Sequence, residues 1–66
     1  MYLNGESLSD DKHFRDHIEH DIPVQVYVGD EHRDIGFVSD YSQHFVRINN
    51  VLYSRSYYRF VSRPGY

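Results

Sequence analysis

The sequence predicts a mainly β domain, a small five-stranded barrel preceded by one short α-helix. Short runs of alternating apolar and polar residues recur through residues 22–62. Turn-forming residues separate these runs, and residues 8–20 carry apolar side chains at helical spacing. Sixty-six residues suffice for one domain. We therefore expect residues 1–66 to form a single unit, with a helix at about 8–20 and a barrel at about 22–62.

The helix is the first expected element. Ser7 and Asp10 approximate a capping box at its start, and carboxylates in the first turn suit the helix dipole. Phe14 and Ile18 are four residues apart and therefore lie on one face. Because two apolar anchors cannot stabilise so short a helix alone, we expect it to pack on the β part.

The first two strands follow directly. Pro23 ends the helix and opens a strand in which valines alternate with other residues as far as Val28. Residues 29–32 are polar and predict a turn. A second strand is expected at 35–39, with Gly36 at a bend or a close approach of two backbones.

Three more strands complete the expected barrel. The third, at 44–48, should direct Val46 and Ile48 inward. Asn49 and Asn50 predict a tight hairpin to a fourth strand at 51–54, because asparagine tolerates the positive φ that such turns require. Residues 57–61 supply a turn and the last strand. Strands this short should curl into a small barrel, which also hides their edges, and the order of elements resembles the SH3-like or Sm-like type.

The chain contains no cysteine, which excludes disulfides and thiolate zinc sites and is typical of a cytosolic protein. Its start lacks the basic and apolar regions of a signal peptide. The longest mainly apolar stretch, 22–28, is far shorter than the roughly 20 residues that cross a bilayer. We expect a soluble, cytoplasmic protein that does not enter membranes.

The net charge of −3 conceals an uneven distribution. Residues 1–40 hold all ten carboxylates and three cations, whereas residues 41–66 hold four arginines and no acid. The basic part also holds seven aromatic residues. Aromatic rings interleaved with arginine suit single-stranded nucleic acid, and they are equally typical of protein interfaces. A small β domain also fills its strands with tyrosine for structural reasons.

Three histidines, His13, His17 and His20, are spaced so that one helix face would present them all. A histidine pair at i, i+4 can bind zinc, nickel or copper. The alternative is a solvated polar face, and we expect neither a metal nor another cofactor. The sequence also lacks a glycine-rich phosphate loop, a Gly-x-Ser-x-Gly elbow and a cysteine nucleophile. Because so small a barrel leaves no interior pocket, we expect no enzymatic activity and no small-molecule substrate.

The order of elements over residues 9–61 resembles the bacterial Sm-like RNA chaperones, the Hfq family. That family has a short N-terminal helix and five bent strands, and it assembles into rings through its last two strands. The similar segments are Phe14 and Ile18; Val24, Val26 and Val28; Gly36, Phe37, Val38 and Tyr41; residues 45–48; and residues 51–55. Ser54 and Arg55 stand where the family has the lysine and histidine of its uridine pocket, and Ser42 stands where it has an aspartate.

The sequence thus predicts a module that binds a protein partner or a copy of itself through its C-terminal half. The candidate contact residues are Arg47, Tyr53, Arg55, Tyr57, Tyr58 and Arg59. The resemblance implies instead a single-stranded RNA binder that uses Tyr53, Arg55, Tyr58 and Arg47. A third possibility is a tyrosine- and histidine-rich structural protein of an assembled coat.

Overall fold

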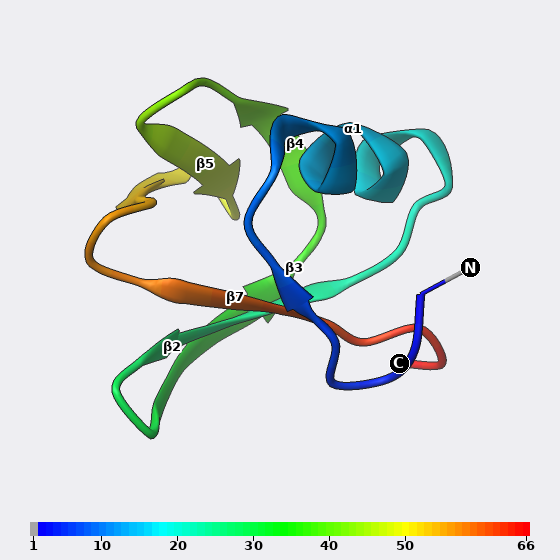
Figure 1. Ribbon diagram of the computed structural model, residues 1–66, viewed down its shortest axis with the longest axis horizontal. Helices are drawn as coiled ribbons and strands as arrows, with labels where there is room; N and C mark the ends of the chain where they lie inside the picture. The colour runs from blue at the N-terminus through cyan, green and yellow to red at the C-terminus, as the bar shows by residue number, and fades with distance from the viewer. Residues whose placement is uncertain (1) are drawn as a thin grey trace.

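The computed structural model describes residues 2–66 and confirms a mainly β chain with one short helix (Figure 1). The elements of this part of the chain are β1 (Ser7–Leu8), α1 (Asp11–Glu19), β2 (Val24–Val28), β3 (Glu31–Gly36), β4 (Val38–Tyr41), β5 (Phe45–Ile48), β6 (Val51–Ser54) and β7 (Arg59–Ser62). Within these residues, no helix is long and apolar enough to cross a membrane.

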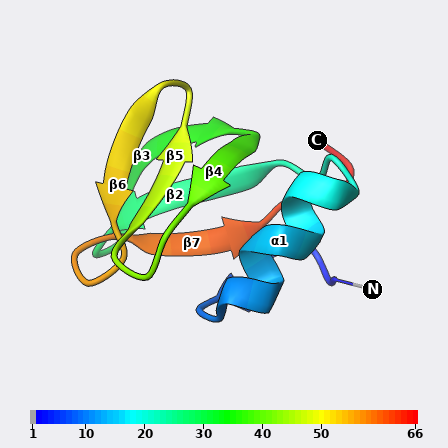
Figure 2. The same cartoon turned by 90° about the horizontal axis from the view of Figure 1, so that it is seen from above.

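The strands form two antiparallel sheets, with the orders β1-β7-β2-β3 and β4-β5-β6. The chain passes from one sheet to the other at Phe37, the single residue between β3 and β4. Figure 2 shows α1 beside β4 and β7. The ring of Phe14 on α1 lies 5.4 Å from that of Phe60 and 6.3 Å from that of Tyr41. The helix therefore packs on both sheets, as its two apolar anchors required.

The strand count differs from the expected five in one closed barrel, since residues 2–66 form seven strands in two sheets. Ser7 and Leu8, expected at the start of the helix, are extended and pair with Val61 and Phe60. The sequence predicts a turn at 29–32, but only residues 29–30 form it, because Glu31 and His32 already belong to β3. Charged residues are common in strands at a sheet edge, where they discourage pairing with other chains.

The helix begins later than the sequence suggested, with Asp10 rather than Ser7 as its N-cap residue. The ring of His13 takes the role that glutamate has in an ordinary capping box. Its Nδ1 accepts hydrogen bonds from the backbone N–H groups of Ser9 (3.0 Å) and Asp10 (3.2 Å). This histidine thus satisfies backbone donors that the helix itself leaves unpaired.

The local predictions around the hairpin are confirmed. Val46 and Ile48 are fully buried, and Asn49 and Asn50 have φ of 54° and 64°. A Cβ atom at Gly36 would lie 2.7 Å from the side chain of Asn49, so a close approach exists at this glycine, but to a side chain rather than to the second backbone that was expected. The core consists of Leu8, Phe14, Val24, Val26, Val38, Val46, Ile48, Tyr53, Phe60 and Val61.

Candidate functional site

Tyr53, one of the six candidate contact residues, lies in the core rather than on the surface. Its side chain is only 6% exposed, and its hydroxyl donates a 2.7 Å hydrogen bond to Oδ2 of Asp34. Burial, followed by the hydrogen bond to the carboxylate, raises the pKa of Tyr53 to about 12. Because Tyr53 is on β6 and Asp34 on β3, this bond joins the two sheets.

The carboxylate of Asp34 also accepts hydrogen bonds from two other residues. Asn49 Nδ2 donates to its Oδ1 at 3.0 Å, and the backbone N–H of Ile35 donates at 2.8 Å. Burial alone would raise the pKa of Asp34, but these bonds and the one from Tyr53 together lower it. Asp34 therefore fastens the β5–β6 hairpin to β3.

Replacing Tyr53 with phenylalanine tests this link. We expect Y53F to lower the free energy of unfolding by about 1–2 kcal/mol, because the half-buried carboxylate of Asp34 loses a donor while the ring stays packed. Urea denaturation followed by circular dichroism at neutral pH measures the change. Y57F is the matched control, and it should shift stability by less than about 0.5 kcal/mol because Tyr57 is exposed. Equal effects of the two variants would contradict the proposed link.

The side chain of Arg55, a second candidate contact residue, also bonds to other parts of the protein instead of pointing into solvent. Its guanidinium donates to Asp11 Oδ1 and to the carbonyl oxygens of Ser42 and Ser9, each at 2.6 Å. It also lies over the ring of Phe14, 4.8 Å from the ring centre. Arg55 therefore connects the start of α1 to the β4–β5 loop, and few of its donors are left for a phosphate or a partner.

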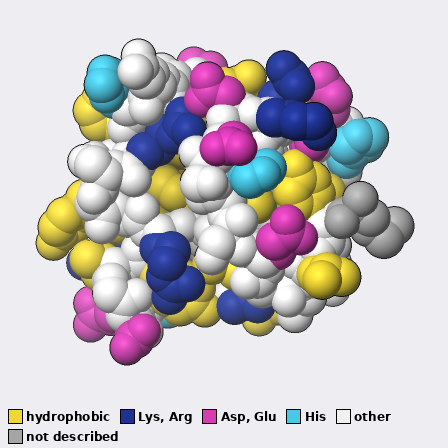
Figure 3. Space-filling view, viewed as in Figure 1, with side chains coloured by type: hydrophobic (Ala, Val, Ile, Leu, Met, Phe, Trp, Pro, Cys, Tyr) yellow, Lys and Arg dark blue, Asp and Glu magenta, His cyan; other side chains and the backbone are white. Residues whose placement is uncertain are grey.

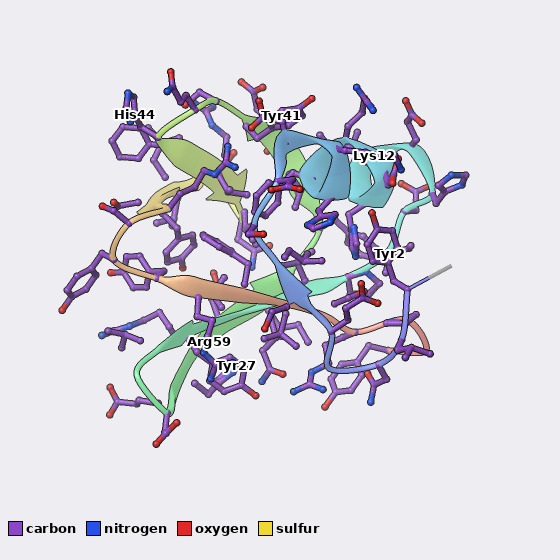
Figure 4. All side chains as sticks on the ribbon, viewed as in Figure 1. Tyr2, Lys12, Tyr27, Tyr41, His44 and Arg59 are labelled. Carbon is purple, nitrogen blue, oxygen red and sulfur yellow. The ribbon has the colours of Figure 1, made fainter. Side chains whose placement is uncertain are left out.

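The remaining candidates are more open but spread over different places. Tyr57 is 66% exposed, and its ring meets that of the half-buried Tyr58 edge to face, 4.9 Å between centres. Arg59 is exposed beside the first sheet, where its guanidinium lies 4.9 Å from the ring centre of Tyr27 (Figure 4). Arg47 is exposed on β5. The structure therefore does not gather the six residues into one site.

An exposed face that the residue-by-residue prediction missed lies on the second sheet. We call it the outer face, and it consists of Asp40, Phe45, Arg47, Leu52 and Ser54. Phe45 is 43% and Leu52 53% exposed. Around them is a shallow depression of about 150 Å³ lined by Asp40, Tyr41, Ser42, Phe45, Arg47 and Leu52. Strand alternation could have revealed this face, because Val46 and Ile48 facing inward places Phe45 and Arg47 outside.

The surface view agrees with this placement. Figure 3 shows hydrophobic side chains reaching the surface along the left edge of the molecule, over β5 and the β6–β7 connection. A depression of about 500 Å³ adjoins this edge and is lined by Gln43, His44, Phe45, Ser54, Arg55 and Ser56. The outer face thus continues toward the turn that carries Tyr57.

Another depression, about 530 Å³, lies elsewhere, between α1 and the two ends of the described chain. Three of its polar side chains are engaged with each other, since Asp16 Oδ2 accepts from Lys12 Nζ at 2.8 Å and from the Tyr2 hydroxyl at 2.7 Å (Figure 4). The bonds from Lys12 and then Tyr2 lower the pKa of Asp16 to about 2. Asp16 is thus already paired, and this depression is a weaker candidate than the outer face.

The three helix histidines have three separate roles. His13 caps the helix, His20 is exposed at the helix end, and His17 is fully buried. In residues 2–66 no three side chains suitable for metal binding come together. The spacing of the histidines therefore does not create a shared metal site in the described chain.

His17 forms a buried pair with Ser62 on β7. Its Nδ1 is 2.6 Å from the carbonyl oxygen of His13, which can only accept, so Nδ1 carries the proton. Nε2 then accepts from the Ser62 hydroxyl at 2.7 Å. A hydroxyl bonded to an imidazole is also found in nucleophilic catalysis, but both residues are 0% exposed, so a substrate cannot reach them. The pair holds α1 to the first sheet.

No family model, curated protein or solved structure matches this chain.

Proposed function

We propose that this chain is a non-enzymatic interaction module that binds a protein partner or a second copy through the outer face and the adjoining β6–β7 turn. One observation carries the proposal. Of the seven large hydrophobic residues that are exposed in the described chain, three lie on the outer face or in the adjoining β6–β7 turn: Phe45, Leu52 and Tyr57. Exposed apolar side chains grouped beside polar ones are typical of contact surfaces.

We also retain the SH3-like or Sm-like architecture as a proposal for the type of fold. The element order supports it, because a helix precedes the β2–β3 hairpin, a bend at Phe37 and the β4-β5-β6 meander. The last strand, β7, then returns to pair with β2. Small barrels of this type commonly bind partners on strand faces and loops, which is compatible with an outer-face site.

Two matched variants test the interaction surface. Phe45→Ser and Leu52→Ser remove exposed apolar groups from the outer face, and Leu3→Ser makes the same kind of change at an exposed residue far from it in sequence. We expect proteins cross-linked to the wild-type chain in cells to fall at least about tenfold with the first two variants and to persist with the third. An identical set of captured proteins for all three variants would contradict the proposal.

Single-stranded RNA is the second candidate ligand. It is favoured by Arg47 and Arg59, which are exposed and form no ion pair in residues 2–66, and by the exposed ring of Tyr57. Of the four residues that the resemblance implies, Tyr53 and Arg55 are engaged inside the protein, Tyr58 is half-buried, and Arg47 is exposed. RNA contact would therefore depend on fewer groups than the resemblance implies.

Salt dependence tests the RNA candidate. Binding of a short uridine-rich RNA through two arginines should weaken with salt, with a logarithmic slope of about −1.4. The double variant Arg47→Ala, Arg59→Ala should abolish that slope. Filter binding or fluorescence anisotropy at two salt concentrations measures it, and absence of binding at low salt would exclude this ligand.

A further inference from the structure

The free edge of β6 differs from the other sheet edges of the described chain. β1 is only two residues long, β3 carries four charged or ionisable residues at 31–34, and β4 packs against α1. Shortness, charge and covering elements are the usual protections of an edge strand. β6 (residues 51–54) is four residues long and contains neither a charge nor a proline. In residues 2–66 no strand pairs with its second side.

The hairpin determines which backbone groups face that edge. Ile48 and Val51 are partners beside the two-residue turn, so their N–H and C=O groups bond to each other. Leu52 is the next residue, and its N–H and C=O must therefore point away from β5. Its side chain lies on the outer face and is about half exposed. Leu52 thus offers a donor, an acceptor and apolar surface at one place.

The last strand cannot provide a complementary edge. β7 pairs with β2 on one side and with β1 on the other. The β1 side is extended by Gly5, whose N–H donates to the Ser62 carbonyl, and by Glu6, whose carbonyl accepts from Ser62 N–H, both at 2.8 Å. A head-to-tail ring in which β6 of one copy pairs with β7 of the next therefore cannot form unless β1 first detaches from β7. Pairing of β6 with itself requires no such change.

We propose that the partner of the outer face is a second copy of this chain, joined by antiparallel pairing of the two β6 strands about a two-fold axis at Leu52. This inference rests on the proposed function and specifies the partner of the same surface. Each Leu52 N–H donates to the Leu52 carbonyl of the other copy, so the contact is self-complementary. The two three-stranded sheets become one six-stranded sheet, with the two Leu52 side chains adjacent.

The charges of the outer face permit this arrangement. Asp40 is the cross-strand partner of Arg47, and Arg47 is that of Leu52, so each copy places an acid beside its arginine. In the pair, the two Arg47 residues are three strand spacings apart, about 14 Å. This exceeds the screening length of about 8 Å at physiological salt, so like charges oppose the contact little.

The available area sets the expected strength. A standard interface buries about 800 Å² of each partner, which is roughly a fifth of the 4308 Å² accessible surface of this chain. A four-residue edge with Leu52 and Phe45 beside it covers less than that. We therefore expect a weak dimer, with a dissociation constant of about 10–100 µM.

Single cysteines test the register in the full chain, which has no cysteine of its own. Hydrogen-bonded partners in antiparallel strands have Cα atoms about 5.5 Å apart, a distance that a disulfide spans. We expect L52C to oxidise to a disulfide-linked dimer at least about tenfold faster than R47C on the same face or L3C away from it. If R47C or L3C reacts as fast as L52C, the proposed pairing is wrong.

Sedimentation of the chain without cysteine completes the test. From about 10 µM to about 1 mM, wild type and Leu3→Lys should convert from monomer to dimer, whereas Leu52→Lys should stay monomeric. A wild-type monomer throughout overturns the second-copy proposal. The broader proposed function would survive that result if F45S and L52S still lost captured proteins, and it would fail if captured proteins were insensitive to both.

Discussion

Replacing His17 with alanine is expected to lower the free energy of unfolding by about 3 kcal/mol. The buried imidazole fills space between α1 and β7, and its removal leaves a cavity. It also leaves the Ser62 hydroxyl without its acceptor and the His13 carbonyl without its side-chain donor. Because a domain of this size has only about 3–7 kcal/mol of stability, H17A should be largely unfolded near 37 °C.

Urea denaturation at neutral pH measures this loss, and His20→Ala is its control. His20 is exposed at the end of α1, so H20A should change stability by less than about 0.5 kcal/mol. A loss below about 1 kcal/mol for H17A would mean that the His17–Ser62 pair is not what secures the helix.

The same residue should make stability depend on pH. Burial lowers the pKa of His17 from 6.5, although the hydrogen bond to the His13 backbone and the nearby carboxylates of Asp16 and Glu6 act in the opposite direction. The unfolded chain therefore binds a proton at His17 more readily than the folded chain does. The stability contributed by neutral His17 is complete above about pH 6.5, and it declines as the pH falls toward the lowered folded value.

Denaturation series between about pH 7.5 and pH 5 would show this decline for wild type. The non-titrating variant His17→Gln should lack that part of the decline, while every other residue is the same in both proteins. Parallel pH profiles of the two proteins would exclude His17 as the source.

Replacing Arg55 with alanine is expected to cost about 2–3 kcal/mol. The change removes the ion pair with Asp11, two hydrogen bonds to carbonyl oxygens and the contact with the Phe14 ring. Arg55→Lys should recover little, because a single ammonium group cannot reproduce the planar fork that reaches three acceptors. Arg47→Ala, at an exposed arginine of the outer face, should leave stability within about 0.5 kcal/mol.

Thermal and urea unfolding of the three variants measure these differences. If R55A and R47A lost the same stability, the inward role of Arg55 would be contradicted. If R55K matched wild type, charge alone and not the geometry of the guanidinium would explain the contact.

The features that the sequence predicted correctly depend on neighbouring residues. Alternation placed Val46 and Ile48 inside, and the Asn49–Asn50 pair predicted the hairpin because positive φ restricts the residue types at such a turn. Helical spacing correctly indicated Phe14 as an anchor. The mainly β class followed from the same local patterns.

The features that it did not predict depend on distant partners. Ser7 and Leu8 become a strand only because Val61 and Phe60 lie beside them. The amino-acid composition indicates a surplus of tyrosine and arginine, but it does not show which of these side chains point into the protein. Tyr53 and Arg55 were therefore expected on the surface. His17 was recoverable in principle, since it lies three residues after Phe14 and shares its face.

The pairing of β1 with β7 joins segments more than fifty residues apart, near the two ends of the described chain. Closing so large a loop is entropically costly, so the pairing of β1 with β7 should be among the last parts of the first sheet to order. Proteolytic removal of β1 would expose the second edge of β7, and removal of β7 would expose an edge of β2. Because an exposed strand edge can pair with another chain, removing β1 should increase aggregation.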